Sequence, residues 1–262
     1  MRSSNGTSYE LSGPGYAPTL VLIHGLGLNR LIWEKYVKRL SGHYQVLDYD
    51  LYGHGQSARP PRSPDLTLFA DQLIELLDEL KIEQAVLIGF SLGGMINRRV
   101  AMDHPDRVKA LVILNSPHER GEEAQRLVEE RATDSAAGGP GATINATLER
   151  WFTADFRELH ADFVQQVREW VLANNHDDYA LCRQVLAFGV VELIRPDPPI
   201  THPTLVMTCE NDSGSTPAMS QSIASEIDGA EVVIVPGLQH MGLSENPSFF
   251  ISAIGEYLEE TL

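Results

Sequence analysis

Residues 85–94 read AVLIGFSLGG and are the most informative part of this sequence. The first four are apolar, as in a buried strand, and a helical pattern runs from Leu92 to Met102 directly afterwards. Gly89–Gly93 between them is a G-x-S-x-G pattern, which on a sharp strand-to-helix turn exposes the serine hydroxyl. Glycines are required there because side chains would collide in so tight a turn. Ser91 is therefore the candidate nucleophile.

Apolar runs of strand length recur along the chain, and several are continuous Val/Ile/Leu runs typical of strands covered on both faces. The predicted strands are Thr19–Ile23, Gln45–Asp50, Ala85–Ile88, Val108–Leu114, Leu205–Cys209 and Val232–Val235. Amphipathic helical stripes lie between them, for example over residues 33–40 and 69–80. This alternation predicts an α/β fold with a mostly parallel sheet.

The alternation stops between Pro117 and Ile200, where the pattern is helical. Ala146–Phe152 and Phe163–Leu172 are candidate helices, and the Ala/Gly/Pro run over residues 136–141 predicts a flexible interruption. The proline-rich residues 196–199 then return the chain to the sheet. We therefore predict a core domain of residues 1–117 and 201–262, with residues 118–200 inserted as a helical cap.

Composition narrows the classes of partner. The 262 residues suit one large core, and the net charge is −16, with nine acidic residues and no Lys or Arg in residues 201–262. Such a field repels nucleic acid and anionic membranes, and it opposes long-range capture of an anionic substrate. No apolar run is long enough to cross a membrane, and the polar N-terminus lacks the apolar core of a signal peptide. Cys182 and Cys209 match no metal or redox spacing, so we expect a cytoplasmic protein without metal; a homodimer stays open.

A serine nucleophile needs a base and a group that orients the base. In an open parallel sheet the partners of G-x-S-x-G follow in the order acid, then histidine, in loops at the carboxyl ends of later strands. His240 lies five residues after the strand Val232–Val235 and is the predicted base. Asp212 and Glu210 both follow the strand before it; we expect Asp212 to be the acid, and Glu210 is the alternative.

The tetrahedral oxyanion also needs hydrogen-bond donors. His24-Gly25-Leu26-Gly27 follows the strand Thr19–Ile23, and its glycines allow backbone N–H groups to turn inward. The N–H groups of Leu26 and of Leu92, the residue after the nucleophile, are the expected pair. The His24 side chain need not react.

These motifs together resemble the α/β-hydrolase superfamily over residues 19–258. The motifs are His24-Gly25-Leu26-Gly27, Asp50 with Gly53-His54-Gly55-Gln56-Ser57, Gly89–Gly94, Asp212 and His240. The resemblance implies a mostly parallel eight-stranded sheet flanked by helices, with a helical cap after the sixth strand. It also implies a Ser91-Asp212-His240 triad, Leu26 and Leu92 amides as the oxyanion hole, and no metal or organic cofactor.

Within the superfamily the chain looks similar to 3-oxoadipate enol-lactonases and related carboxylesterases. The similarity lies in residues 146–153 and 214–217, in Trp33 and in the Tyr49-Asp50 pair. Two positions depart from the enol-lactonase pattern. They are Gly25, where that pattern tends to have Ser, and Tyr52, where it has Arg.

Specificity is expected to depend on the residues around the nucleophile and in the cap. Candidate pocket residues are Phe90, Trp151, Phe152 and Met241, although an aromatic pair such as Trp151-Phe152 could equally pack the cap against the core. Arg98, Arg99, Arg150 and Arg183 are candidates for binding a substrate carboxylate, with surface solvation the alternative for each.

The predicted activity is hydrolysis of a small-molecule carboxylic ester or lactone through an acyl-enzyme. Two other reactions use the same triad: cofactor-free haloperoxidase (perhydrolase) chemistry, with which Phe90 is compatible, and hydrolysis of carbon–carbon bonds. A small-molecule receptor on a hydrolase scaffold is the alternative of another class.

Overall fold

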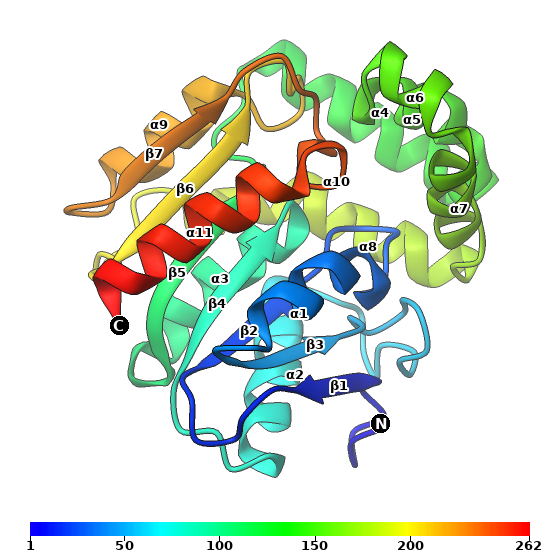
Figure 1. Cartoon of the computed structure of the whole chain (residues 1–262). Coiled ribbons are helices and arrows are strands. Elements are labelled where there is room, and N and C mark those ends of the chain that lie inside the picture. Colours follow the sequence, from blue (N-terminus) through cyan, green and yellow to red (C-terminus); the bar gives the residue numbers. More distant parts are fainter.

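A seven-stranded sheet forms the centre of the molecule in the computed structural model, which describes all 262 residues (Figure 1). The strand order is β1-β3-β2-β4-β5-β6-β7, and every neighbouring pair is parallel except β1 and β3. The strands are β1 (Tyr9–Ser12), β2 (Thr19–Ile23), β3 (Gln45–Tyr49), β4 (Ala85–Phe90), β5 (Val108–Leu114), β6 (Thr204–Cys209) and β7 (Glu231–Val235). Every residue of β2, β4 and β6 is buried, which explains their continuous apolar sequences.

All six predicted strands are present, and the mostly parallel sheet is confirmed. The expected count of eight strands is wrong, since the sheet has seven. Residues before β1 pair only through an isolated bridge between Arg2 and Ser8, so no further edge strand forms. The sequence did not predict β1, because its four residues are only partly buried and contain no apolar run.

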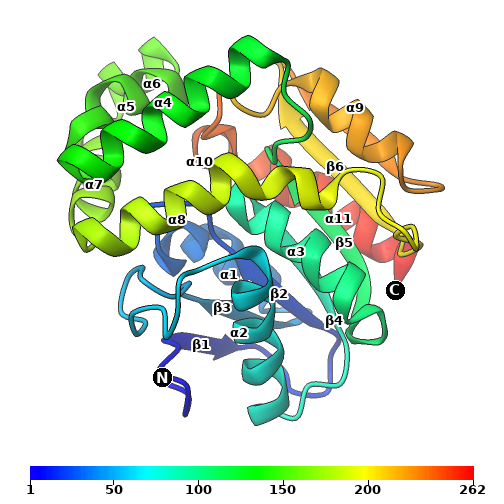
Figure 2. The same cartoon turned by 180° about the vertical axis from the view of Figure 1, so that it is seen from behind.

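Helices cover both faces of the sheet (Figures 1 and 2). The first face carries α1 (Glu34–Leu40) and α11 (Pro247–Thr261), while α2 (Leu66–Glu79), α3 (Leu92–Asp103) and α9 (Pro217–Ser225) lie on the other. In α2 the apolar stripe is buried against the sheet, and the Asp65 side chain accepts a hydrogen bond from the Leu68 N–H at the start of the helix. This double cover accounts for strands that are apolar throughout.

Between β5 and β6 the chain contains no strand. It forms α4 (Glu122–Gly138), α5 (Ile144–Trp151), α6 (Ala154–Leu159), α7 (Ala161–Leu172) and α8 (His176–Phe188). These helices lie beyond the carboxyl ends of the parallel strands, where the arrowheads point in Figure 1. The flexible interruption predicted over residues 136–141 is wrong for its first part, because alanine favours helix and α4 continues to Gly138. Gly139, with a φ of +67°, ends that helix.

Short elements complete the structure. They are η1 (Arg30–Trp33), η2 (Pro105–Arg107), η3 (Pro140–Thr143), η4 (Gly189–Leu193) and α10 (Gly242–Glu245). No helix combines the length and the apolar character needed to cross a lipid bilayer.

Candidate active site

Ser91 lies on the sharp turn between β4 and α3, with a φ of +56°. Glycine is required on both sides of it for lack of space: a Cβ on Gly89 would lie 2.2 Å from the Gly93 carbonyl oxygen, and one on Gly93 would lie 2.2 Å from the Ile23 carbonyl oxygen. The Ser91 N–H donates to the Leu114 carbonyl at 2.8 Å, which fixes the turn against β5. The position sits between the ends of β2 and β5, because β4 pairs with both strands.

His240 follows β7 and reaches Ser91 across the sheet. The Ser91 hydroxyl donates to His240 Nε2 at 3.2 Å, and His240 Nδ1–H donates to Asp212 Oδ2 at 2.6 Å. Both bonds fit a neutral imidazole with its proton on Nδ1, which leaves Nε2 free to accept a proton from Ser91. All three side chains are buried, so little water competes for these hydrogen bonds.

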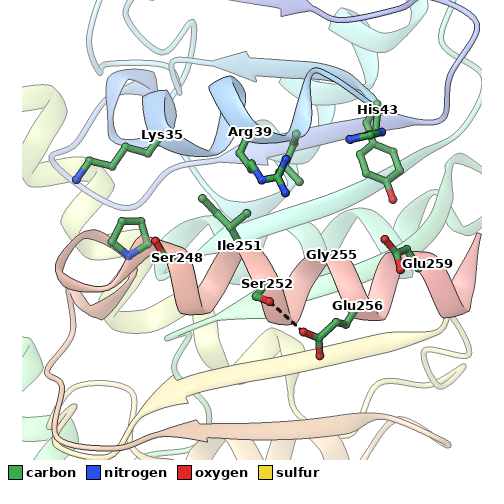
Figure 3. A pocket seen from close by; sticks show the side chains of 12 residues that line it. Lys35, Arg39, His43, Ser248, Ile251, Ser252, Gly255, Glu256 and Glu259 are labelled. Carbon is green, nitrogen blue, oxygen red and sulfur yellow. Dashed lines mark hydrogen bonds between the residues drawn. The ribbon is translucent and has the colours of Figure 1, made fainter.

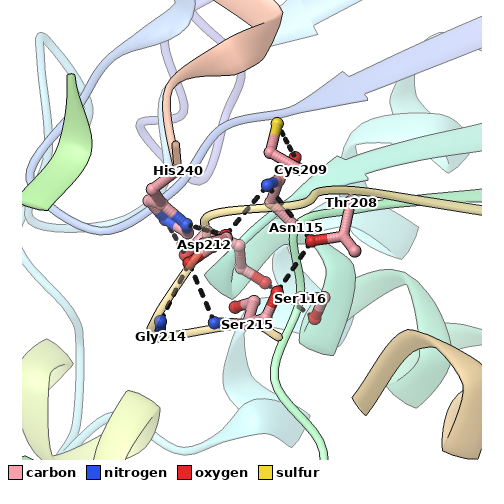
Figure 4. Close-up of polar contacts among 9 residues, drawn as sticks. Asn115, Ser116, Thr208, Cys209, Asp212, Gly214, Ser215 and His240 are labelled. Atoms are coloured by element: carbon pink, nitrogen blue, oxygen red, sulfur yellow. Dashed lines mark hydrogen bonds and ion pairs between the residues drawn. The ribbon is translucent and has the colours of Figure 1, made fainter. Parts of the chain in front are cut away.

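The Asp212 carboxylate accepts four hydrogen bonds (Figure 4). Its Oδ1 accepts from the N–H groups of Gly214 and Ser215 at 2.9 and 3.0 Å, and its Oδ2 accepts from Asn115 Nδ2 at 2.9 Å as well as from His240. Burial alone would raise the pKa of Asp212, but the neighbouring His240 and the hydrogen-bond donors hold that pKa below its ordinary value. The carboxylate is therefore kept ionised beside the histidine.

Sequence reasoning missed Asn115. It is the first residue after β5 and has a φ of +46°. No motif marks it; the only available signal was its place at the end of the strand next to β4. Its amide joins the Asp212 carboxylate to Thr208 Oγ1 at 3.3 Å, so it helps to orient the acid (Figure 4).

Glu210, the alternative acid, lies elsewhere. Its side chain is exposed, and its Oε2 accepts a hydrogen bond from the Gly237 N–H at 2.9 Å. It fastens the loop between β7 and His240 instead of contacting the imidazole. The structure thus brings Asp212, and not Glu210, to the histidine.

The expected oxyanion donors belong to two segments near Ser91: Leu26 lines the same cavity, and Leu92 is the next residue in the chain. Leu26 is in a turn closed by a bond from the Leu28 N–H to the Gly25 carbonyl at 3.2 Å, and its own N–H has no partner within the chain. Gly25 is packed so closely that a Cβ there would be 3.1 Å from the Ser91 Cβ. Leu92 is the first residue of α3, where an N–H has no helical partner.

His24 holds this loop through both ring nitrogens. Its Nδ1–H donates to the Gly25 carbonyl at 2.8 Å, and its Nε2 accepts from the Leu51 N–H at 3.0 Å. Burial lowers the pKa of His24 to about 4, so the ring stays neutral. This side chain is engaged in structure and is not free to react.

A cavity of about 60 Å³ opens onto Ser91 and His240, enough for a few water molecules. Leu26, Phe90 and Trp151 contribute to its wall. The Phe90 and Trp151 rings also flank the imidazole, with centroids 4.9 and 5.9 Å from that of His240. Phe90 and Trp151 therefore line the cavity beside Ser91 and His240.

The other two predicted pocket residues do not line this cavity. Phe152 is fully buried and stacks on Phe156, with ring centroids 5.4 Å apart, so it packs the helices together. Met241 is also fully buried, and its N–H donates to the Trp151 carbonyl at 2.9 Å. The two halves of the Trp151-Phe152 pair thus have different surroundings, since adjacent residues at a helix end point in different directions.

Four arginines line the same cavity, and no acidic residue does. They are Arg120, Arg131, Arg150 and Arg183. Two of the sequence candidates lie elsewhere: Arg98 is buried and donates to the Pro117 carbonyl, and Arg99 pairs with Asp103. Arg131, one turn after Val128 on the cavity face of α4, was not predicted.

A larger cavity lies away from these groups. It is a groove of about 750 Å³ between α1 and α11 (Figure 3). Lys35, Arg39 and His43 face Glu256 and Glu259 across it. The Ser252 hydroxyl donates to the Glu256 carboxylate at 2.9 Å, but that pair is exposed and no histidine takes part in it. The chemistry is therefore expected at the strand ends, not in the larger groove.

The structure contains no cluster of metal-ligating side chains and no exposed thiol. No three His, Cys, Asp or Glu side chains are grouped so as to hold a metal ion. Cys182 and Cys209 are buried free thiols, and burial raises the pKa of each to about 12. Such thiols stay protonated and unreactive.

Known proteins resemble this chain in sequence and in structure. Residues 18–133 match the family model described as alpha/beta hydrolase fold. The chain is 29% identical to (E)-2-((N-methylformamido)methylene)succinate hydrolase of Acinetobacter baylyi, over 100% of this chain and 98% of that protein. It is 27% identical to 3-oxoadipate enol-lactonase 2 of the same organism, over 94% of this chain and 91% of that protein.

The crystal structure of the enol-lactonase from Burkholderia xenovorans LB400 is also similar. It has a TM-score of 0.89 and 29% sequence identity, and the match covers 97% of this chain and 96% of that one. The central sheet, its helical layers and the family match agree with each other. The chain therefore has the α/β-hydrolase fold and resembles the hydrolases of the α/β-hydrolase superfamily.

Proposed function

We propose that this protein is a serine hydrolase that cleaves a carboxylic ester or lactone of a small molecule through an acyl-enzyme. The observation that carries the proposal is the chain of hydrogen bonds from Ser91 Oγ to His240 Nε2 at 3.2 Å and from His240 Nδ1 to Asp212 at 2.6 Å. These distances suit a nucleophile, its base and the group that orients the base. Similarity to proteins named enol-lactonases supports a lactone as well as an open ester.

In the proposed mechanism, Ser91 Oγ attacks the substrate carbonyl carbon while His240 Nε2 accepts the hydroxyl proton. The N–H groups of Leu26 and Leu92 donate to the oxyanion that forms. The imidazolium, stabilised by Asp212, then gives its proton to the leaving oxygen as the carbon–oxygen bond breaks. A water molecule, deprotonated by His240, hydrolyses the acyl-enzyme and restores Ser91.

Residues 118–200 serve in this proposal as a cap over the site. Two contacts join them to the loops that carry the reacting groups. Asn174 Nδ2 donates to the Gly27 carbonyl at 3.0 Å beside the oxyanion loop, and the N–H of Met241, next to His240, donates to the Trp151 carbonyl at 2.9 Å. A cap held at both places would exclude water from the acyl-enzyme, except for the water that reacts.

The test is turnover of p-nitrophenyl acetate, a neutral ester, by the wild type and by Ser91→Ala. We expect kcat to fall by about 10⁴-fold or more, because no other group replaces the nucleophile. Ser248→Ala, a serine change in the distant groove between α1 and α11, is the control and should leave kcat within twofold. Turnover by Ser91→Ala above a tenth of the wild-type value would exclude the proposed mechanism.

A further inference from the structure

Three arginines from three helices meet in the cavity above Ser91: Arg131 from α4, Arg150 from α5 and Arg183 from α8. None of these three side chains makes a hydrogen bond or an ion pair anywhere in the structure. Arg183 is only 6% exposed. A side chain at Gly214, in the loop of the acid Asp212, would lie 3.6 Å from Arg150 Nη1, so Arg150 reaches the loop that orients the base.

Most other arginines of this chain have partners. Seven other arginines form ion pairs with Asp or Glu, and the sequence contains 36 acidic residues. Burying unpaired charges costs free energy. Burial, and next the charges of Arg131 and Arg183, lower the pKa of Arg150 to about 10. No hydrogen bond or ion pair within the protein offsets this cost, which points to a partner supplied by a ligand.

The chemistry of the guanidinium indicates the ligand class. It binds a carboxylate through two parallel hydrogen bonds, and each such pair needs one arginine. The fourth arginine of the cavity, Arg120, already donates to the carbonyls of Leu186 and Ala187. One carboxylate would leave two of the other three guanidinium groups without a partner. Two carboxylates would leave one guanidinium group without a partner. Hydrolysis of the ester then creates a further carboxylate at the acyl carbon.

We propose that the cavity binds a dianion: a small ester or lactone that carries two carboxylate groups held by Arg131, Arg150 and Arg183. This inference rests on the proposed function, because it assigns the substrate class of the same site. The carboxylates face the cap, and the scissile carbonyl faces Ser91 on the core. The free volume of about 60 Å³ is small, so the flexible arginine side chains move aside as they pair with the ligand.

The cavity arginines also explain how an anion could bind to a protein with an acidic surface. A net charge of −16 opposes the approach of an anion, whereas the cavity itself has an excess of positive charge. Close, desolvated charges act far more strongly than distant, screened ones. The local arginines therefore determine which substrate stays bound.

The experiment measures inhibition of p-nitrophenyl acetate hydrolysis by butyrate and by glutarate, which differ by one carboxylate. In the wild type at low salt, we expect the inhibition constant of glutarate to be at least tenfold lower. Arg131→Gln, Arg150→Gln and Arg183→Gln should each raise it by about 10- to 100-fold, the range expected for a lost charged hydrogen bond. Arg126→Gln, an exposed arginine of the same helix α4, is the matched control and should leave it unchanged.

Equal inhibition by butyrate and glutarate, or glutarate inhibition that survives all three replacements, would overturn the inference. Calorimetry of glutarate binding to Ser91→Ala tests the dianion site separately from the proposed hydrolase activity, because this variant lacks the nucleophile. Hydrolysis of the neutral ester without selective glutarate binding refutes only the dianion site. Arginine-dependent glutarate binding without any ester hydrolysis refutes only the hydrolase. If a Gln variant does not fold, the Arg→Lys variant at the same position replaces it. That variant keeps the charge but loses the paired hydrogen bonds, so it must still weaken glutarate binding.

Discussion

Replacing Asp212 by asparagine tests how the site orients its base. The two N–H donors to Oδ1, from Gly214 and Ser215, keep an acceptor in the new side chain. The new amide nitrogen, however, faces His240 Nδ1–H and Asn115 Nδ2, which are both donors. The imidazole must then move its proton to Nε2 to accept from the amide, and it can no longer accept the Ser91 proton.

The structure sets the size of the effect. The bond from His240 to Asp212 is 2.6 Å long and buried, in the range of strong charge-assisted hydrogen bonds. Loss of the correct tautomer in comparable triads lowers kcat about 10⁴-fold, or about 5 to 6 kcal/mol in the activation free energy. The unmet Asn115 donor should cost about 1–3 kcal/mol of stability, so the variant still folds.

The assay is kcat for p-nitrophenyl acetate at pH 7, with thermal unfolding as the check on folding. Glu210→Gln is the control, because that exposed carboxylate contacts only the Gly237 N–H at 2.9 Å. We expect its kcat to stay within threefold of the wild type. A Glu210→Gln loss larger than that of Asp212→Asn, or an Asp212→Asn loss below tenfold, would refute the assignment of the acid.

Two further predictions concern stability. Gly93→Ala should lower the free energy of unfolding by about 3 kcal/mol or more, because its Cβ would lie 2.2 Å from the Ile23 carbonyl oxygen. A Cβ at Gly255 would meet open space, so Gly255→Ala should raise the free energy of unfolding by up to about 1 kcal/mol. Urea unfolding compares the two variants, and equal stabilities would contradict the steric argument. Burial raises the pKa of Asp48 to about 6 and outweighs the opposing ion pair with Arg30 at 3.2 Å, so the stabilising contribution of Asp48 is present below pH 4 and is lost as the pH rises through 6. Asp48→Asn should therefore gain up to about 3 kcal/mol over the wild type at pH 7 and nothing at pH 3.5; a gain that is the same at both values would count against this interpretation.

The parts of the molecule that were predicted correctly depend on local patterns. The six strands that were located have mostly apolar sequences, and all of them except the edge strand β7 are largely buried, so residue type alone could place them. The turn at Ser91 combines a strand, small residues and a helix within a few positions. His240 and Asp212 could be proposed because the carboxyl ends of neighbouring parallel strands meet at one edge of the sheet.

The predictions that failed depend on side-chain direction and on edges. Met241 and Phe152 point into the core, although their neighbours in sequence, His240 and Trp151, line the cavity. The edge strand β1 is too short and too exposed to give an apolar pattern. In each case the local sequence is compatible with both outcomes, and packing against distant elements selects one.

The sequence by itself located six of the seven strands and the candidate nucleophile Ser91, because both follow from patterns within a few residues. Only the tertiary structure decided between Asp212 and Glu210, since two carboxylates in one loop differ only in the direction they take. It alone also brought Asn115 to the acid and Arg131, Arg150 and Arg183 to one cavity. These groups lie far apart along the chain, and only the packing of helices over the strand ends puts them within reach of each other.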